Sequence, residues 1–369
     1  MKLLFWISLG LVAYTYVGYL GWLYLLTRLR RCPTLRLPML PRVSIIIAAR
    51  NEEKNLPTKL ENLRHLDYPP DRLQIVIASD GSTDATASIL QDHVPFILPV
   101  VLDHSNGKAS ALNEAVKHAT GEILVFQDAR QSVDPKAITE LVACFSSSDV
   151  GAVSGELLLE ADPNASSSDA LGIYWKIEKA IRKLESVSGS VVGVTGAIYA
   201  VRRELYPRIP SGTILDDVFV PMHIARAGKR VIFQPSAIAR DHLFSEDGKE
   251  FSRKVRTLTG NYQLLRIAPW LLSPSNPMLF RFISHKLLRL VVPLLLVIML
   301  LSSALAGGPF ARGAFFAQIA FYTLAASGTL IPAAKQFKPV AIANTFVMLN
   351  AAATLAFYNF VRGRNQVWT

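Results

Sequence analysis

The sequence predicts an α/β domain with a mostly parallel sheet, joined to α-helices that cross a membrane. Between residues 43 and 144, short runs of branched apolar residues alternate with stretches of helical periodicity. This alternation is typical of parallel sheets covered by helices. Four apolar stretches of membrane length lie outside that region, one before it and three after it. The composition agrees, because 51% of the residues are hydrophobic and only 18% are charged.

The expected strands are short and rich in branched side chains, and a helical stretch follows each of them. The strands are expected at Val43–Ala48, Leu73–Ala78, Ile97–Leu102 and Ile123–Phe126. The helices are expected from Leu56 to Leu66 and at Asp84–Gln91, Ala109–His118 and Pro135–Cys144. Beyond residue 150 the pattern weakens, to a helix at Tyr174–Leu184 and a glycine-bearing strand at Val191–Val201.

The first apolar stretch, Leu3–Leu26, carries no charge and can cross a hydrocarbon core of roughly 30 Å. It lacks a small-residue cleavage site, so we expect a retained anchor rather than a signal peptide. The three later stretches are Leu290–Gly307, Ala314–Ala334 and Val340–Val361. Before them, Phe251–Leu272 is basic and amphipathic, as expected of a segment that lies at the membrane surface.

The net charge of +11 is distributed unevenly along the chain. Residues 1–51 hold seven basic and no acidic residues, and residues 251–369 hold twelve basic and no acidic residues. The stretch between them has a net charge of −8. The positive charge therefore flanks the apolar stretches, and by the positive-inside rule the α/β domain is cytosolic. We expect an integral protein of the plasma (inner) membrane, with the lipid bilayer as a partner and no nucleic acid.

A polar motif follows each of the four expected strands. The motifs are ARNEE (Ala49–Glu53), SDGSTD (Ser79–Asp84), NGKASALNEA (Asn106–Ala115) and QDAR (Gln127–Arg130). Asp-Gly and Asn-Gly also form ordinary turns, so any one motif alone would be interpreted as a turn. Because the carboxyl ends of parallel strands meet at one edge of a sheet, the four motifs together predict one ligand crevice.

Three spaced acids and a basic motif resemble a known family. Asp80, Asp128 and Asp217, followed by Arg253–Thr257, are similar to the D, D, D, (Q/R)xxRW pattern of membrane-embedded family 2 glycosyltransferases. That group includes the synthases of cellulose, chitin, hyaluronan and poly-N-acetylglucosamine. The resemblance covers residues 43 to about 265. It implies a GT-A type, Rossmann-like domain that is a hexosyl- or N-acetylhexosaminyl-transferase using a nucleotide-sugar donor.

The resemblance also implies roles for individual residues. Asp217, with Asp216 beside it, matches the proposed general base, and Asp128 matches the first acid of the metal-binding DxD motif. A divalent cation, Mg²⁺ or Mn²⁺, is therefore expected, held by oxygen ligands. Contacts to the donor are implied for Glu52, Asp80, Lys108, Asp128, Arg253 and Arg256. The alternative for the two arginines is an interfacial helix that only binds anionic lipid.

Two residues depart from the family pattern. Arg130 stands where the motif has its second acid, and Thr257 stands where the family has a tryptophan that stacks on the acceptor sugar. A guanidinium cannot ligate a metal but binds phosphate well, so we expect Arg130 to contact the donor diphosphate.

The expected organisation has five parts. They are an N-terminal transmembrane anchor (residues 1–27), the cytosolic GT-A domain (43–250), amphipathic interface helices (251–285), a C-terminal membrane region of two to three spans (286–361) and a basic tail (362–369). The last apolar stretch, Val340–Val361, looks less apolar than the others and contains several amides. We expect it to be interfacial or re-entrant, returning Arg364 and Trp368 to the active site. A plain fourth span fits as well.

The expected function is inverting transfer of a sugar, from a UDP-sugar, to a growing polysaccharide at the cytosolic membrane face. Accessory export subunits are left open. The alternative is a non-processive enzyme with a lipid or polyprenyl-phosphate acceptor, which Thr257 favours. A catalytically inactive assembly subunit is disfavoured by the intact Asp80, Asp128 and Asp217. A transporter is disfavoured because no ionisable residue lies well inside the apolar stretches.

Overall fold

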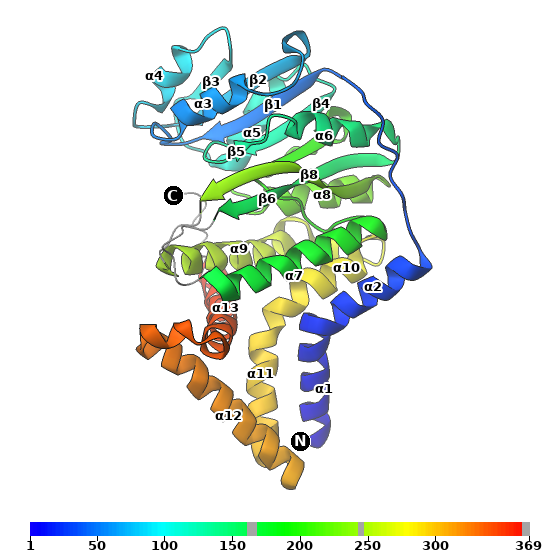
Figure 1. Cartoon of the computed structure of the whole chain (residues 1–369), viewed down its shortest axis with the longest axis vertical. Helices are drawn as coiled ribbons and strands as arrows, with labels where there is room; N and C mark the ends of the chain where they lie inside the picture. The colour runs from blue at the N-terminus through cyan, green and yellow to red at the C-terminus, as the bar shows by residue number, and fades with distance from the viewer. Residues whose placement is uncertain (161–167, 243–246, 364–369) are drawn as a thin grey trace.

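The computed structural model describes residues 1–160, 168–242 and 247–363. A sheet with helices on both faces stands over a group of long apolar helices (Figure 1). The described part of the sheet has eight strands in the order β3-β2-β1-β4-β7-β6-β8-β5. They are β1 (Val43–Ala49), β2 (Leu73–Asp80), β3 (Leu98–Leu102), β4 (Ile123–Asp128), β5 (Ser132–Val133), β6 (Val150–Glu160), β7 (Ile198–Arg202) and β8 (Arg230–His242).

The first four strands are parallel to one another and confirm the strands expected from the sequence. The rest of the sheet is mixed. β7 is antiparallel to both β4 and β6, β8 runs parallel to β6, and β5 is antiparallel to β8. The uninterrupted run of parallel strands therefore ends at β4, and the carboxyl ends of β1 to β4 form one edge of the sheet.

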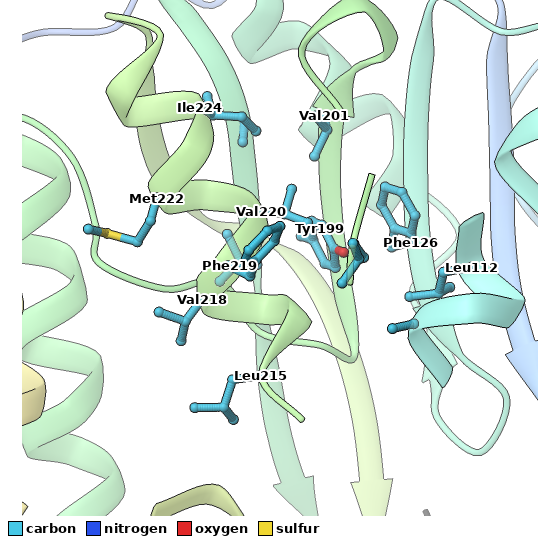
Figure 2. Close-up of a cluster of buried hydrophobic side chains, with 14 of the residues drawn as sticks. Leu112, Phe126, Tyr199, Val201, Leu215, Val218, Phe219, Val220, Met222 and Ile224 are labelled. Atoms are coloured by element: carbon cyan, nitrogen blue, oxygen red, sulfur yellow. The ribbon is translucent and has the colours of Figure 1, made fainter. Parts of the chain in front are cut away.

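Two apolar layers cover the sheet. One layer contains α5 (Lys108–Lys117) and α8 (Asp216–Arg226), and the other contains α3 (Leu56–Arg64) and α6 (Ala137–Ala143). A shorter helix, α4 (Thr86–Gln91), follows β2. Figure 2 shows the buried cluster under α8, where Phe219 and Val220 lie near Tyr199 and Phe126. The rings of Phe126 and Tyr199 stack with centroids 4.7 Å apart. This packing fixes α8 against β4 and β7, and so fixes where its first residues lie.

The expected strand at Val191–Val201 is wrong in its first half, because only Ile198–Arg202 is a strand. The preceding backbone bonds elsewhere. The amide of Val191 donates to the carbonyl of Val231, and the amide of Val194 donates to the carbonyl of Asp217. The segment 193–196 is therefore a loop that lies against the start of α8.

Four apolar helical segments among the described residues are long enough to cross a membrane. The first is Lys2–Leu29, in which α1 (Lys2–Ala13) and α2 (Tyr19–Leu29) are joined by one π-helical turn. The second is Leu279–Leu305, which contains α10 (Leu279–Phe282) and α11 (Leu288–Leu305). The other two are α12 (Pro309–Leu330) and α13 (Lys338–Val361).

Helix α13 differs from the sequence expectation. Its mean hydropathy is higher than that of α12, so the interpretation of Val340–Val361 as the least apolar stretch is wrong. Two of its amides are also satisfied by neighbouring helices: Asn344 donates to Thr329 Oγ1 at 2.7 Å, and Asn350 donates to Tyr16 Oη at 3.3 Å. This weakens the argument from apolarity and amides, and an interfacial or re-entrant segment stays a prediction. The expected return of Arg364 and Trp368 lies outside the described residues.

Two helices lie between the sheet and the apolar helices (Figure 1). They are α7 (Ser168–Val187) and α9 (Asp247–Ile267). Ile181 of α7 packs against Tyr19 and Leu23 of α2, and the Tyr19 hydroxyl donates to Glu185 Oε1 at 2.6 Å. Val255 of α9 packs against two alanines of α13. The catalytic half and the membrane half of the molecule therefore share apolar contacts.

Candidate active site

The first two polar motifs are joined by hydrogen bonds at the carboxyl ends of β1 and β2. The Asn51 side chain accepts from the amide of Thr83 at 2.9 Å, and the amide of Glu52 donates to Thr86 Oγ1 at 2.8 Å. The Glu52 carboxylate accepts from Asn55 Nδ2 at 2.6 Å, so this expected donor ligand is partly engaged within its own loop. Its contact with the donor remains a prediction.

Asp80, at the end of β2, is completely buried. Its carboxylate accepts three hydrogen bonds, from the Ser105 hydroxyl and from the amides of Asn106 and Gly107, at 2.8 to 2.9 Å. Asp80 therefore holds the loop after β3 in place. Sequence reasoning expected this residue as a direct nucleotide ligand, which remains a prediction.

The residue after Asp80 must be glycine for two reasons. Gly81 has φ +58, a backbone conformation that residues with a Cβ rarely adopt. A Cβ at this position would also lie 2.4 Å from the amide nitrogen of Ser105. The loops after β2 and β3 thus contact each other closely at the edge of the sheet where the polar motifs predicted the ligand site.

Lys108, the first residue of α5, brings together acids from two distant parts of the chain. Its ammonium lies 2.8 Å from Asp128 Oδ1, at the end of β4, and 3.8 Å from Asp216 Oδ2, at the start of α8. Burial alone would lower the pKa of Lys108, but Asp128 and Asp216 raise it above its ordinary value. Lys108 is therefore a permanent cation between the expected metal ligand and the expected catalytic pair.

Asp216 and Asp217 occupy the first turn of α8, where the helix dipole favours negative charge. Asp216 is buried, and its Oδ2 atom accepts no hydrogen bond from a described residue. Asp217 is partly exposed. Burial and then the neighbouring Asp216 raise the pKa of the Asp217 carboxyl to about 6. Asp217 thus has both the access and the basicity that a general base needs near neutral pH.

The loop 193–196 connects the two ends of this site. A Cβ on Gly196 would lie 3.8 Å from both Asp128 Oδ2 and Lys108 Nζ. A Cβ on Gly193 would lie 3.4 Å from the carbonyl oxygen of Asp217 and 3.9 Å from Lys286 Nζ. Gly196 therefore leaves room beside Asp128, whereas Gly193 lets the loop pack closely on the start of α8, because a Cβ there would lie 3.2 Å from the Val218 side chain.

Arg130 has a carboxylate partner within the protein. Its guanidinium lies 2.5 Å from Asp241 Oδ2, and Gln131 Nε2 donates to the same oxygen at 2.9 Å. Asp241, near the end of β8, was not expected from the sequence, because its pairing with the QDAR motif is a long-range contact. Binding of Arg130 to the donor diphosphate remains a prediction, and in that state Asp241 would share its charge.

Lys59 is a second residue that sequence reasoning missed. It is buried in α3, and its ammonium donates to Gln127 Oε1 and to the carbonyl of Gln131, both at 2.7 Å. Burial lowers the pKa of Lys59 to about 7. Its helical spacing from Leu56 and Leu63 would have placed it on the buried face. Lys59 supports the loop that carries Asp128.

Arg253 and Arg256 lie on the same face of α9 as Gly260, two turns and one turn before it. Four residues beyond Arg256, Gly260 packs on Leu215, the residue before Asp216, and a Cβ there would lie 2.6 Å from its side chain. Residues 253, 256 and 260 share one helical face. This placement agrees with the expected donor role of both arginines, which remains a prediction.

Asp128 would hold a divalent cation in the way that Mg²⁺ is commonly bound, by one or two carboxylates together with phosphates of the substrate. The Asp128 side chain is 36% exposed, and its Oδ2 atom faces the space left by Gly196. Among the described residues no three His, Cys, Asp or Glu side chains gather into a complete metal site. The donor diphosphate would therefore have to supply the remaining ligands.

The fold and the site together define a class. The parallel strands of the sheet end at one edge in polar loops, and at this edge the ammonium of Lys108 lies between an acid of β4 and an acid of the pair that begins α8. These are features of GT-A type glycosyltransferases.

Comparisons with known proteins agree. The model of glycosyl transferase family 2 matches residues 44–209. The Bacillus subtilis protein YdaM, named as a glycosyltransferase, is 26% identical over 257 residues, which are 64% of this chain and 60% of that protein. The poly-beta-1,6-N-acetyl-D-glucosamine synthase of Staphylococcus aureus is 25% identical over 249 residues, which are 64% of this chain and 58% of the synthase. The chain thus matches about three fifths of the length of these relatives.

A solved structure resembles this chain over almost its entire length. It is the mannosyltransferase PcManGT of Pyrobaculum calidifontis, in complex with GDP-Man and Mn²⁺. The superposition has a TM-score of 0.71 at 25% identity, and it covers 97% of this chain and 99% of that chain. Residues 44–209 thus carry a glycosyltransferase family 2 domain, and the chain has a GT-A type α/β fold with apolar helices that could span a membrane.

Proposed function

We propose that this protein transfers a sugar from a nucleoside diphosphate sugar to a hydroxyl acceptor at the cytosolic face of the plasma membrane. The observation that carries the proposal is the connection between Asp217 and Asp128. One half-buried lysine, Lys108, contacts both Asp128 and Asp216, and Asp216 is the neighbour of Asp217, whose pKa is raised. Such an arrangement supports proton removal at Asp217 and leaving-group stabilisation near Asp128 and Lys108.

The reaction follows from these positions. The acceptor oxygen forms a bond to the anomeric carbon while its proton moves to a carboxylate oxygen of Asp217. The bond from that carbon to the diphosphate breaks, and the diphosphate oxygen keeps the electron pair. Lys108 stabilises the charge that develops there. A single displacement of this kind inverts the anomeric configuration. A divalent cation bound at Asp128 would neutralise the leaving diphosphate.

Two acceptor classes remain, and the membrane helices favour one of them. The Staphylococcus relative supports the polysaccharide expected from the sequence. However, a cavity of about 520 Å³ among α1, α11, α12 and α13 is lined by apolar side chains apart from Gln318 and Tyr322. A sugar chain crossing there would leave most of its hydroxyls without hydrogen-bond partners. A lipid-linked acceptor, which stays at the membrane surface, fits these helices better.

The donor and the product are tested in one experiment. The purified full-length protein in a maltoside detergent is incubated with Mg²⁺ or Mn²⁺ and with a UDP-sugar or GDP-mannose. Release of the nucleoside diphosphate is measured with and without a lipid extract. We expect release with one donor, stimulation by the extract, and a lipid-soluble product carrying one sugar. If no donor led to release of a nucleoside diphosphate, the proposal would be refuted. A polymeric product would instead favour a growing polysaccharide as the acceptor.

A further inference from the structure

Two basic side chains lie on the membrane side of Asp217. Lys286 belongs to the second membrane segment, and Arg182 belongs to α7. The charges of both are close enough to Asp217 to lower its pKa. Both side chains are half-buried, and the Lys286 ammonium lies 3.9 Å from the position that a Cβ of Gly193 would take, beside the backbone of Asp217. They occupy the end of the site opposite to Lys108 and Asp128.

The nearest carboxylates of this region are engaged by other groups. Glu178 contacts Arg289 and His285, and Glu185 accepts from Tyr19 and His285. Although burial alone would raise it, Arg289 and then His285 hold the pKa of Glu178 well below its usual range. Glu178 therefore has enough positive charge around it without Lys286.

Neither Lys286 nor Arg182 forms an ion pair with a carboxylate of the described residues. Among residues 1–160, 168–242 and 247–363, no carboxylate oxygen lies within 4.0 Å of either cationic group, and neither donates a hydrogen bond. Half-buried cations without close partners are unfavourable unless a ligand supplies the negative charge. An anion beside Asp217 would in turn be repelled by that carboxylate unless two cations faced it.

We propose that Lys286 and Arg182 bind a phosphate group of the lipid-linked acceptor, and thereby hold the acceptor hydroxyl at Asp217. The proposal rests on the proposed function and names the chemistry of its acceptor. A guanidinium and an ammonium together suit a phosphate, which accepts several charge-assisted hydrogen bonds. Lys286 lies in the first third of the second membrane segment, Leu279–Leu305. Arg182 lies in α7, one of the two helices between the sheet and the apolar helices (Figure 1).

The test measures binding, so it does not require the natural acceptor. Radiolabelled farnesyl phosphate and farnesol, which differ only in the phosphate, are bound to the full-length protein in a maltoside detergent that contains no phosphate. The variants are Lys286→Met, Lys286→Arg and Arg182→Met. The control is Lys183→Met, which removes an exposed charge from the neighbouring position of the same helix.

We expect the parent to bind farnesyl phosphate about tenfold or more tightly than farnesol. Lys286→Met and Arg182→Met should each lose about tenfold in affinity for farnesyl phosphate, whereas Lys286→Arg and Lys183→Met should stay within about threefold. Inorganic phosphate should compete only weakly. Equal binding of farnesol, equal competition by inorganic phosphate, or unchanged binding by Arg182→Met would overturn the proposal.

Nucleoside diphosphate binding, measured in the same samples, separates this site from the donor site. The methionine variants should keep it within about twofold, which also shows that they are folded. A parallel loss of nucleotide binding in a variant with an unchanged thermal transition would assign the two cations to the donor and overturn the proposal. Failure of the parent to use any nucleotide sugar would instead refute the proposed function, and would leave the farnesyl phosphate result unaffected.

Discussion

The ammonium of Lys108 lies 2.8 Å from Oδ1 of Asp128, and this contact joins the start of α5 to the end of β4. Lys108→Met would leave Asp128 and Asp216 facing each other without the cation between them. We expect the donor KM to rise about tenfold or more and kcat to fall as well, because the leaving diphosphate loses a fixed positive charge. Steady-state kinetics with the best donor measure both constants. Lys117→Met, an exposed change at the other end of α5, should behave like the parent.

Asp217 is predicted to remove the acceptor proton. Asp217→Asn keeps the size of the side chain but not its basicity, so turnover should fall about 10²-fold or more while the donor dissociation constant changes little. Turnover within a few-fold of the parent would contradict this assignment. In that case Asp216→Asn, made alongside, should carry the loss.

The pH dependence follows from the pKa of Asp217, which is raised to about 6. The base acts in its deprotonated form, so kcat/KM should be level above that pH and should fall as the pH drops through about 6. The decrease at low pH is measured as kcat/KM between pH 4.5 and 8.5 at saturating metal. If the residual activity of Asp217→Asn decreased over the same pH range, another group would be responsible for the decrease.

Arg130, in the altered metal motif, is held by Asp241 in the structure and is predicted to contact the donor. Removal of divalent cations with EDTA should abolish nucleoside diphosphate release, and added Mn²⁺ or Mg²⁺ should restore it. Arg130→Ala should raise the donor KM, and Arg130→Asp should shift the metal concentration needed for half-maximal rate. Asp241→Asn isolates the effect of freeing Arg130. Parental metal and donor dependence in both Arg130 variants would limit Arg130 to its ion pair with Asp241.

Gly81 is predicted to hold two loops together at the edge of the crevice. Gly81→Ala introduces both an unfavourable φ and a Cβ only 2.4 Å from Ser105, so the thermal transition should fall by several degrees and donor binding should weaken. Gly212→Ala is the control, because Gly212 has φ +77 but open space around its Cβ position. An equal effect of the two changes would mean that strain alone, and not the contact between loops, matters.

The sequence could predict the parallel half of the sheet and the ends of its strands. Strands β1, β2 and β4 are largely buried runs rich in branched residues, and β3 is a short, more exposed apolar run at the edge of the sheet. In each case the pattern is local, and so is the polar motif that follows the strand. The order of β6, β7 and β8 depends on pairing between distant segments, for which no local pattern exists. The glycines of the loop 193–196 illustrate the difference, because they looked like part of one strand.

The site shows the same limit. Lys108, Asp128 and Asp216 were expected to lie together, and they do. The contact of Arg130 with Asp241 and the approach of Lys286 to Asp217 join segments more than 60 residues apart, and neither could be inferred from spacing. Lys59 is the exception, because helical periodicity alone would have placed it on the buried face of α3.

The hydrogen bond between Tyr19 and Glu185 makes the N-terminal helix part of the folded domain rather than a replaceable tether. If another apolar helix of equal length took its place, Glu185 would keep its charge but lose a donor in a buried position. Chimeric proteins that exchange this helix should therefore fold poorly unless the partner on α7 is exchanged with it. Over evolutionary time the two positions should change as a pair.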